Sequence, residues 1–225
     1  MRFRSHRLSF GRRAFAPVVF LFGLVSLLVG APPLIAAAMA QGAPAAQVHK
    51  PVSLPDMALG TAKAPVTIVE YASMTCQHCA AFEQNVFPML KSKYMDTGKV
   101  RFVFREFPLD IKAAAASMLA RCIAGDDAGK FFATIDLLFK QQDQLMEQTK
   151  DTLKLIGKQG GMDEVAVETC ERDQILLDKI KADQAFAFET LKVDATPTFF
   201  VNGERLRGAM SFEELEERIK PLLKK

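Results

Sequence analysis

A buried strand that passes directly into a helix limits the folds open to this chain. Residues 65–71 (Pro-Val-Thr-Ile-Val-Glu-Tyr) are β-branched, aromatic and nearly continuously apolar, as is typical of a strand in the middle of a sheet. Residues 77–94 then carry apolar side chains at helical spacing, and Pro88 predicts a kink within them. Residues 99–105 alternate and predict a second strand. This order predicts two parallel strands joined by a right-handed crossover.

A long helical block then interrupts the α/β pattern. Residues 110–191 contain no good strand, but helical patterns cover residues 111–124, 130–142, 149–158, 163–170 and 174–191. Strand signals return on either side of Asn202-Gly203, a strong hairpin signal, and Ser211 and Glu214 form a capping box that opens a last helix. The sequence therefore predicts an α/β fold. A central mixed sheet flanked by helices is split by an inserted all-helical subdomain.

The first forty residues have the order of an export signal. Residues 1–13 are rich in arginine, residues 14–30 are nearly all apolar, and small residues follow, ending in Ala38-Met39-Ala40 before Gln41. This order predicts a secretory signal peptide over residues 1–40 that is cleaved near Ala40/Gln41. An uncleaved membrane anchor is the alternative, because the apolar run extended to Ala40 is about long enough to span a bilayer.

Export changes how the rest of the chain is interpreted. Arg12-Arg13 resembles a twin-arginine signal, so the export route stays open, but either route predicts the periplasm, where disulfides form. Without residues 1–40 the chain has 24 basic and 26 acidic residues, so no basic surface for nucleic acid is expected. We expect residues 41–57 to form a loosely held arm. The α/β domain would then comprise residues 58–109 and 192–225, and the helical insertion residues 110–191.

The residues Cys76-Gln77-His78-Cys79 lie where the first strand passes into the helix. Two thiols at this spacing can close a small disulfide, and Cys76 would lie at the helix N-terminus, where free N–H groups and the helix dipole stabilise an anion. A protonated His78 would add a positive charge beside the sulfur. These effects lower the pKa of Cys76 and stabilise the reduced form, which makes the disulfide a better oxidant. The motif therefore predicts a catalytic dithiol that donates its disulfide.

Thr196-Pro197 is the second motif, and it stands directly before the strand signal of residues 198–201. Proline is a poor continuation of a strand ladder, because it lacks the N–H donor. We therefore expect a cis bond that places this dipeptide opposite the two cysteines. It would leave a neighbouring backbone N–H and C=O free for a substrate chain.

Together these motifs resemble the thioredoxin superfamily, and the helical insertion resembles its DsbA-like branch of secreted thiol–disulfide oxidoreductases. The resemblance covers residues 58–223 and implies a thioredoxin fold with a helical lid. It implies that Cys76 is the exposed attacking cysteine, Cys79 the buried resolving cysteine and Pro197 the cis-proline. It also implies that Glu70, six residues before Cys76, is a buried acid that accepts the proton of Cys79.

Two departures from this branch leave the direction of electron flow open. Gln77 stands where the best-known oxidases have proline, and Thr196 stands where they have valine, whereas threonine is common in isomerase and reductase relatives. The leading prediction is a periplasmic oxidase that donates the Cys76–Cys79 disulfide to exported proteins through a mixed disulfide at Cys76. The alternative is an isomerase or reductase that a membrane electron donor keeps reduced. A thiol protein that binds a soft metal through Cys76, Cys79 and His78 is a third hypothesis, from another class.

The expected partners follow from that chemistry. They are unfolded exported proteins with free thiols and a membrane-bound redox partner, either a reoxidising protein of the quinone-reductase type or a reducing donor. A monomer is expected. The Cys76–Cys79 disulfide serves in place of a cofactor. No zinc site is expected, because such a site needs two more ligands near the motif, and only His78 lies there.

Cys122 and Cys170 both fall in helical stretches of the insertion. In an oxidising compartment, an even number of remaining cysteines predicts a structural disulfide between them. Some alphaproteobacterial members of the DsbA-like branch are similar in this respect. Two free buried cysteines that act as small apolar residues are the alternative.

Overall fold

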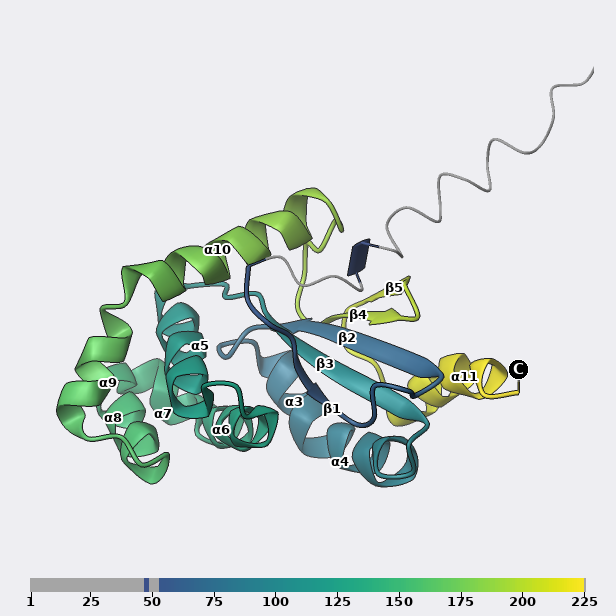
Figure 1. Ribbon diagram of the computed structural model, residues 1–225, viewed down its shortest axis with the longest axis horizontal. Coiled ribbons are helices and arrows are strands. Elements are labelled where there is room, and N and C mark those ends of the chain that lie inside the picture. Colours follow the sequence, from purple (N-terminus) through teal and green to yellow (C-terminus); the bar gives the residue numbers. More distant parts are fainter. Residues whose placement is uncertain (1–46, 49–52, 225) are drawn as a thin grey trace, which may run out of the picture. The chain divides into compact units, whose positions relative to one another are not determined.

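The computed structural model describes residues 47–48 and 53–224, and Figure 1 shows them as a single sheet with helices around it. The sheet has five strands in the order β1-β3-β2-β4-β5. Their bounds are β1 Met57–Leu59, β2 Val66–Ala72, β3 Val100–Glu106, β4 Thr198–Val201 and β5 Glu204–Arg207. Only β2 and β3 pair in parallel, and the other neighbours are antiparallel, so the sheet is mixed as predicted.

The crossover between β2 and β3 contains three consecutive helical segments where one kinked helix was predicted. They are α3 Gln77–Asn85, α4 Phe87–Leu90 and the π-helix Lys91–Met95. Val86 ends α3 and begins α4, and Pro88 lies in the first turn of α4. A proline is tolerated there because the first N–H groups of a helix have no partner within it. The predicted kink is therefore a break two residues before the proline.

The two faces of the sheet are covered by different helices. One face packs on α3, α6 (Ala128–Lys140) and α11 (Phe212–Leu222) through Phe102, Phe104 and Phe199. The other face packs on the end of α10 (Gln174–Glu189) through Val69, Tyr71 and Phe200. Because successive side chains of a strand point to opposite faces, Glu70 lies on the same face of β2 as Ile68, toward α3.

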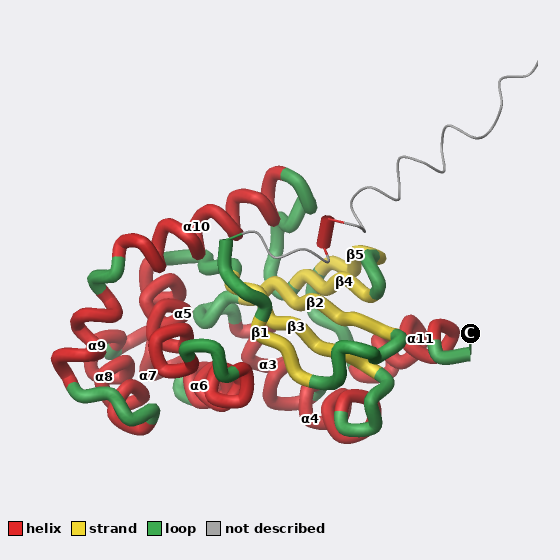
Figure 2. Tube along the Cα trace, in the orientation of Figure 1, coloured by secondary structure: helices red, strands yellow, loops and turns green. Residues whose placement is uncertain are grey.

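The helical insertion runs between β3 and β4, and Figure 2 shows its helices gathered beside the strands rather than among them. Its helices are α5 Ile111–Ala124, α6 Ala128–Lys140, α7 Gln142–Glu147, α8 Thr149–Gln159, α9 Glu164–Glu171 and α10 Gln174–Glu189. Four of them begin at an aspartate whose side chain accepts a hydrogen bond from the first turn, namely Asp110, Asp127, Asp163 and Asp173. Among the described helices, none is long and apolar enough to cross a membrane.

The hairpin after β4 has the geometry that its sequence predicts. Asn202 and Gly203 have φ values of 45° and 90°, which is the left-handed region that a two-residue hairpin turn requires. The side chain of Asn202 also binds the start of β2: its Oδ1 accepts from the N–H of Thr67 at 2.7 Å, and its Nδ2 donates to the carbonyl of Pro65 at 3.1 Å. The turn therefore fixes how β4 sits against β2.

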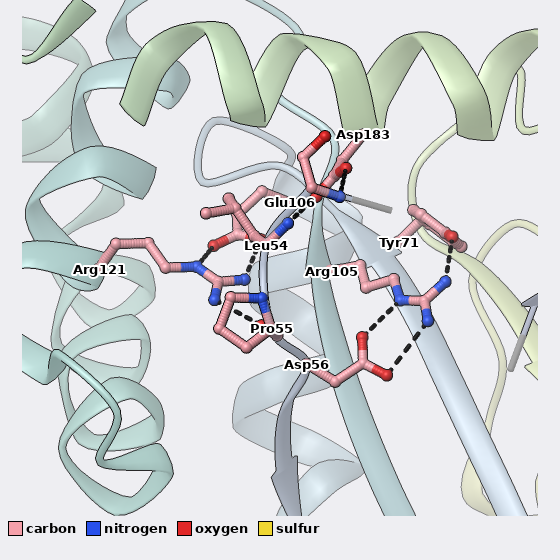
Figure 3. A network of polar contacts seen from close by, with 9 residues as sticks. Leu54, Pro55, Asp56, Tyr71, Arg105, Glu106, Arg121 and Asp183 are labelled. Carbon is pink, nitrogen blue, oxygen red and sulfur yellow. Dashed lines mark hydrogen bonds and ion pairs between the residues drawn. The ribbon is translucent and has the colours of Figure 1, made fainter. Parts of the chain in front are cut away.

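The expectation of a loosely held arm is wrong for residues 53–57, and Figure 3 shows the polar contacts around Leu54, Pro55 and Asp56. Met57 belongs to β1, a strand that the sequence did not predict, and pairs with Phe104. Asp56 accepts from the buried guanidinium of Arg105 at 2.8 Å, and Asp183 of α10 accepts from the N–H of Ser53 at 2.7 Å. A buried guanidinium needs acceptors, and this segment supplies one. The segment is therefore part of the fold.

A second buried guanidinium ties the same segment to the insertion. Arg121 of α5 donates two hydrogen bonds to the carboxylate of Glu106 at the end of β3, one of them at 2.7 Å, and a third to the carbonyl of Pro55 at 2.7 Å. The two side chains are only 6% and 5% exposed. This ion pair therefore joins the sheet, the insertion and the N-terminal segment away from water.

Candidate active site

Cys76 occupies the N-cap of α3, which is the helix start that the sequence predicts. Its backbone is extended, with φ −85° and ψ 114°, and its sulfur accepts a hydrogen bond from the backbone N–H of Cys79 at 3.2 Å. A serine or aspartate oxygen usually fills this position. A thiolate accepts the same bond more strongly, because the helix N-terminus favours negative charge.

The two cysteines are free, lie within hydrogen-bond reach of each other, and differ sharply in acidity. A hydrogen bond from the Cys79 thiol, with help from Thr196 and from the backbone N–H groups of Cys79 and His78, lowers the pKa of Cys76 from 9.0 to about 6, although burial opposes the change. Burial raises the pKa of Cys79 far above its ordinary value, and the bond to Cys76 and the charge of Glu70 act in the same direction. At neutral pH the pair therefore holds one thiolate, on Cys76.

One detail of the predicted motif needs correction. Cys76 was expected to be exposed, but it is only 7% exposed, against 1% for Cys79, because its sulfur lies in the cap of α3 beside the Thr196 carbonyl. The backbone N–H of His78 helps to lower the pKa of Cys76. The side chains of His78 and Gln77 are exposed, and the role expected of the imidazole stays a prediction. The charge at the sulfur is therefore held mainly by hydrogen bonds.

The bond between Thr196 and Pro197 is cis, as predicted, and Pro197 is buried beside the dithiol. The carbonyl of Thr196 is not free, however, because the thiol of Cys76 donates to it at 3.3 Å. A thiolate has no hydrogen to donate, so loss of the Cys76 proton releases this carbonyl. The cis dipeptide thus lies opposite Cys76, with its carbonyl engaged only while the sulfur is protonated.

Two buried carboxyl groups lie behind the dithiol. Glu70 of β2 is 1% exposed, and burial raises its pKa well above the ordinary value, with the charges of Glu83 and Cys76 acting in the same direction. Glu83, which the sequence reasoning missed, lies four residues after Cys79 and therefore on the same face of α3. Among the described residues, one carboxyl oxygen of each has no hydrogen-bond partner. The sequence did contain one signal for Glu83: it is a charged residue between the apolar Phe82 and Val86 of the same predicted helix.

A second missed residue, Gln142, contacts the loop before α3 from the insertion. Its Nε2 donates to the carbonyls of Met74 and Cys76, at 2.8 and 3.1 Å. No local pattern marks this residue, because its role depends on a contact that joins segments 66 and 68 residues apart.

Cys122 of α5 and Cys170 of α9 are joined in a disulfide, with their Cα atoms 6.2 Å apart. They pack with Met118 and Ile180 in a cluster separate from the core that contains Cys76 and Cys79. This pair therefore links two helices of the insertion and takes no part in the dithiol site. Within the described part of the chain, no group of three or more His, Cys, Asp or Glu residues is placed to hold a metal ion.

A family model described as thioredoxin matches residues 53–221. The chain belongs to the thioredoxin family. Among solved structures, this thioredoxin-family chain is similar to α-DsbA1 from Wolbachia pipientis, with a TM-score of 0.72 and 32% identity over 79% of this chain and 95% of that one. The helical insertion between β3 and β4 makes the fold DsbA-like, as the sequence predicts.

Curated relatives are also similar to this thioredoxin-family chain. A Bacillus cereus protein named as disulfide bond formation protein D is 30% identical over 177 residues, which cover 74% of this chain and 78% of that protein. A Rickettsia bellii protein named as a protein-disulfide oxidoreductase is 37% identical over 150 residues, or 66% of this chain and 57% of that protein. The aligned region thus spans just over half the length of the Rickettsia relative.

Glu83 is expected to make folding stability depend on pH. Burial raises its pKa from 4.5 to about 8, so the folded protein binds this proton more tightly than the unfolded chain does. Stability should therefore fall as the pH rises through that window, and Glu83→Gln should remove part of the fall. The measurement is urea unfolding of the oxidised protein, in which neither Cys76 nor Cys79 titrates. The variant and the unsubstituted protein should have similar free energies of unfolding near pH 4.5, and the variant should be the more stable of the two near pH 8.

The matched control for this measurement is Glu147→Gln, because Glu147 is an exposed acid. The control should keep the pH dependence of the unsubstituted protein. Identical pH profiles for Glu83→Gln and the unsubstituted protein would contradict the buried, protonated state of Glu83.

Proposed function

We propose that this protein is a thiol–disulfide oxidase that donates the Cys76–Cys79 disulfide to thiol-bearing exported proteins. The observation that carries this proposal is the contrast between the two sulfurs. Hydrogen bonds lower the pKa of Cys76 to about 6, while burial raises that of Cys79. A pair that is stable in its reduced, thiolate form gives up its disulfide readily, because stabilising the reduced state raises the reduction potential.

The proposed reaction has two exchange steps. A substrate thiolate attacks the sulfur of Cys76, the Cys76–Cys79 bond breaks, and Cys79 leaves as a thiolate that takes a proton from Glu70. A second substrate thiolate then attacks the substrate sulfur of the mixed disulfide, which releases Cys76 as a thiolate. The substrate loses two electrons and gains a disulfide, and the protein gains both electrons. Cys76 is the sulfur attacked because it keeps more exposed surface than Cys79.

Reoxidation requires a partner that accepts two electrons from the reduced pair. We infer a membrane-bound electron acceptor, in keeping with an exported protein whose signal peptide is removed near Ala40/Gln41. That signal lies outside the described residues. The names of the Bacillus and Rickettsia relatives support a role in disulfide chemistry.

The reduction potential of the Cys76–Cys79 pair is expected to be more oxidising than about −270 mV, the value of a reducing thioredoxin. A three-unit fall in the pKa of Cys76 corresponds to about 90 mV at most, and solvent screening reduces the gain to between about 40 and 90 mV. Equilibration with glutathione buffers, followed by alkylation of free thiols and mass measurement, gives this potential. A value near about −270 mV would contradict the oxidase proposal and favour the reductase alternative that Thr196 raises.

The pH dependence of the same pair has a defined sign. Because the folded-state pKa of Cys76 lies below its ordinary value, the reduced folded protein gains stability as the pH rises from about 6 to 9.0. It loses that stability as the pH falls through about 6. As the pH rises through this window, the reduction potential of the pair should therefore become more oxidising relative to that of a pair of ordinary thiols.

A further inference from the structure

The helical insertion reaches the active-site loop through one buried amide. Gln142 is the first residue of α7 and is only 8% exposed. Its Nε2 donates to the carbonyl of Met74 at 2.8 Å and to the carbonyl of Cys76 at 3.1 Å. An amide nitrogen has two N–H donors, so this loop uses both of them.

The carbonyl of Cys76 is also where α3 begins. It accepts from the N–H groups of Cys79 and Ala80, both at 3.1 Å, and Gln142 of α7 adds a third donor. The orientation of this peptide decides where the Cys76 side chain leaves the backbone. It therefore also decides whether the sulfur meets the Cys79 N–H that caps the helix.

The insertion holds the other side of the same loop through Asp110. One of its carboxylate oxygens accepts from the hydroxyl of Thr75 at 2.7 Å, and the other caps α5 at the N–H of Ala113, at 2.9 Å. The residue directly before Cys76 is thus fixed to the first helix of the insertion. The loop of residues 73–76 is held from outside the α/β domain on two sides, independently of its own helix.

We propose that Gln142 is a positioning residue for thiol–disulfide exchange at Cys76. It holds the backbone from Met74 to Cys76 so that the sulfur stays at the N-cap, where the first N–H groups of α3 stabilise its charge. Gln142 touches no reacting atom and acts through the loop. The helical insertion thereby sets the reactivity of the dithiol as well as covering it. This inference rests on the proposed role of Cys76 as the reactive thiolate.

The test replaces Gln142 by methionine, which has similar length and no N–H donor, with Gln144→Met as the matched control, because Gln144 is an exposed residue of the same helix. The pKa of Cys76 is followed through the ultraviolet absorbance of its thiolate in the reduced protein. The rate of reaction with oxidised glutathione is measured alongside. Gln142→Met is expected to raise the pKa by roughly 0.5 to 1 unit, the range that corresponds to one net hydrogen bond. Well below the pKa, the reactive thiolate falls about three- to tenfold.

The outcomes separate this inference from the proposed function. A Cys76 pKa near 6 in the unsubstituted protein and in both variants would overturn the role of Gln142 and leave the oxidase proposal intact. An ordinary cysteine pKa in the unsubstituted protein would overturn the oxidase proposal itself. A purely structural Gln142 would lower stability without moving the pKa. If Gln142→Met does not fold, Gln142→Asn decides, because it draws the amide back by one methylene, and an unchanged pKa there overturns the inference.

Discussion

Cys76→Ala is expected to abolish disulfide transfer to a reduced substrate protein, with a loss of at least about 10³-fold in rate. Cys79 cannot take over the reaction, because it is 1% exposed and burial raises the pKa of its thiol. The measurement is the loss of free thiols from a reduced, unfolded protein in the presence of oxidised glutathione. Near-normal transfer by Cys76→Ala would contradict the assignment of Cys76 as the reacting sulfur.

Cys79→Ala should still react with the substrate but should release it poorly, whereas Cys76→Ala should not react at all. Cys76 can still form a mixed disulfide, but the back-reaction in which Cys79 attacks Cys76 and expels the bound chain is lost, so release depends only on attack by a second substrate thiolate. A covalent adduct with the substrate should therefore accumulate and disappear on reduction, which non-reducing electrophoresis detects. The control is Cys122→Ser combined with Cys170→Ser, assayed where it is folded. This control should keep its transfer activity, because that disulfide packs in a separate cluster.

Glu106→Gln is expected to lower the free energy of unfolding by about 3–5 kcal/mol. The substitution keeps the shape of the side chain but removes the charge that balances Arg121, whose guanidinium is 6% exposed. An unpaired buried charge is costly, because the desolvation of the guanidinium is no longer offset by an ion pair. Urea unfolding of the oxidised protein measures the change.

A surface ion pair provides the matched comparison for Glu106→Gln. Glu204 binds Arg218 at 3.1 Å, but these side chains are 57% and 50% exposed. Glu204→Gln should therefore cost less than about 1 kcal/mol, because water already screens the pair. Equal effects of the two substitutions would show that the buried pair between β3 and α5 contributes no more than a surface contact.

The elements that the sequence predicted well are those with a local cause. Residues 198–201 and 204–207 were placed correctly because Asn202-Gly203 carries its own turn geometry. The helix start at Cys76 was placed correctly because a change from strand to helical periodicity marks it. β1 was missed because it has only three residues and exists through its pairing with β3. Gly60 at its end allows the close approach, since a Cβ there would lie 2.3 Å from the carbonyl oxygen of Val100.

In the active site, too, the features with a local cause were predicted and those that depend on tertiary contacts were missed. Local order along the chain was enough to predict that Cys76 would lie at a helix N-terminus. The cis bond at Thr196-Pro197 was predicted from its place before a strand together with the resemblance to the thioredoxin superfamily. Glu83 and Gln142 were missed because burial and contact partners decide their roles. In the sequence they are only an acid within one predicted helix and a glutamine at the end of another. The small exposure of Cys76 was likewise hidden, since it follows from the Thr196 carbonyl, 120 residues away in the chain.

The sequence by itself determined the strand and helix order, the helical insertion and the identity of the two reactive sulfurs, because these depend on side-chain periodicity and on residue types a few positions apart. Only the tertiary structure decided that an N-terminal segment completes the sheet edge, that two buried carboxyl groups stand behind Cys79, and that an insertion amide holds the loop at Cys76. The physical reason is that burial and hydrogen-bond partners are properties of neighbours in space, and here those neighbours come from segments far apart in the chain.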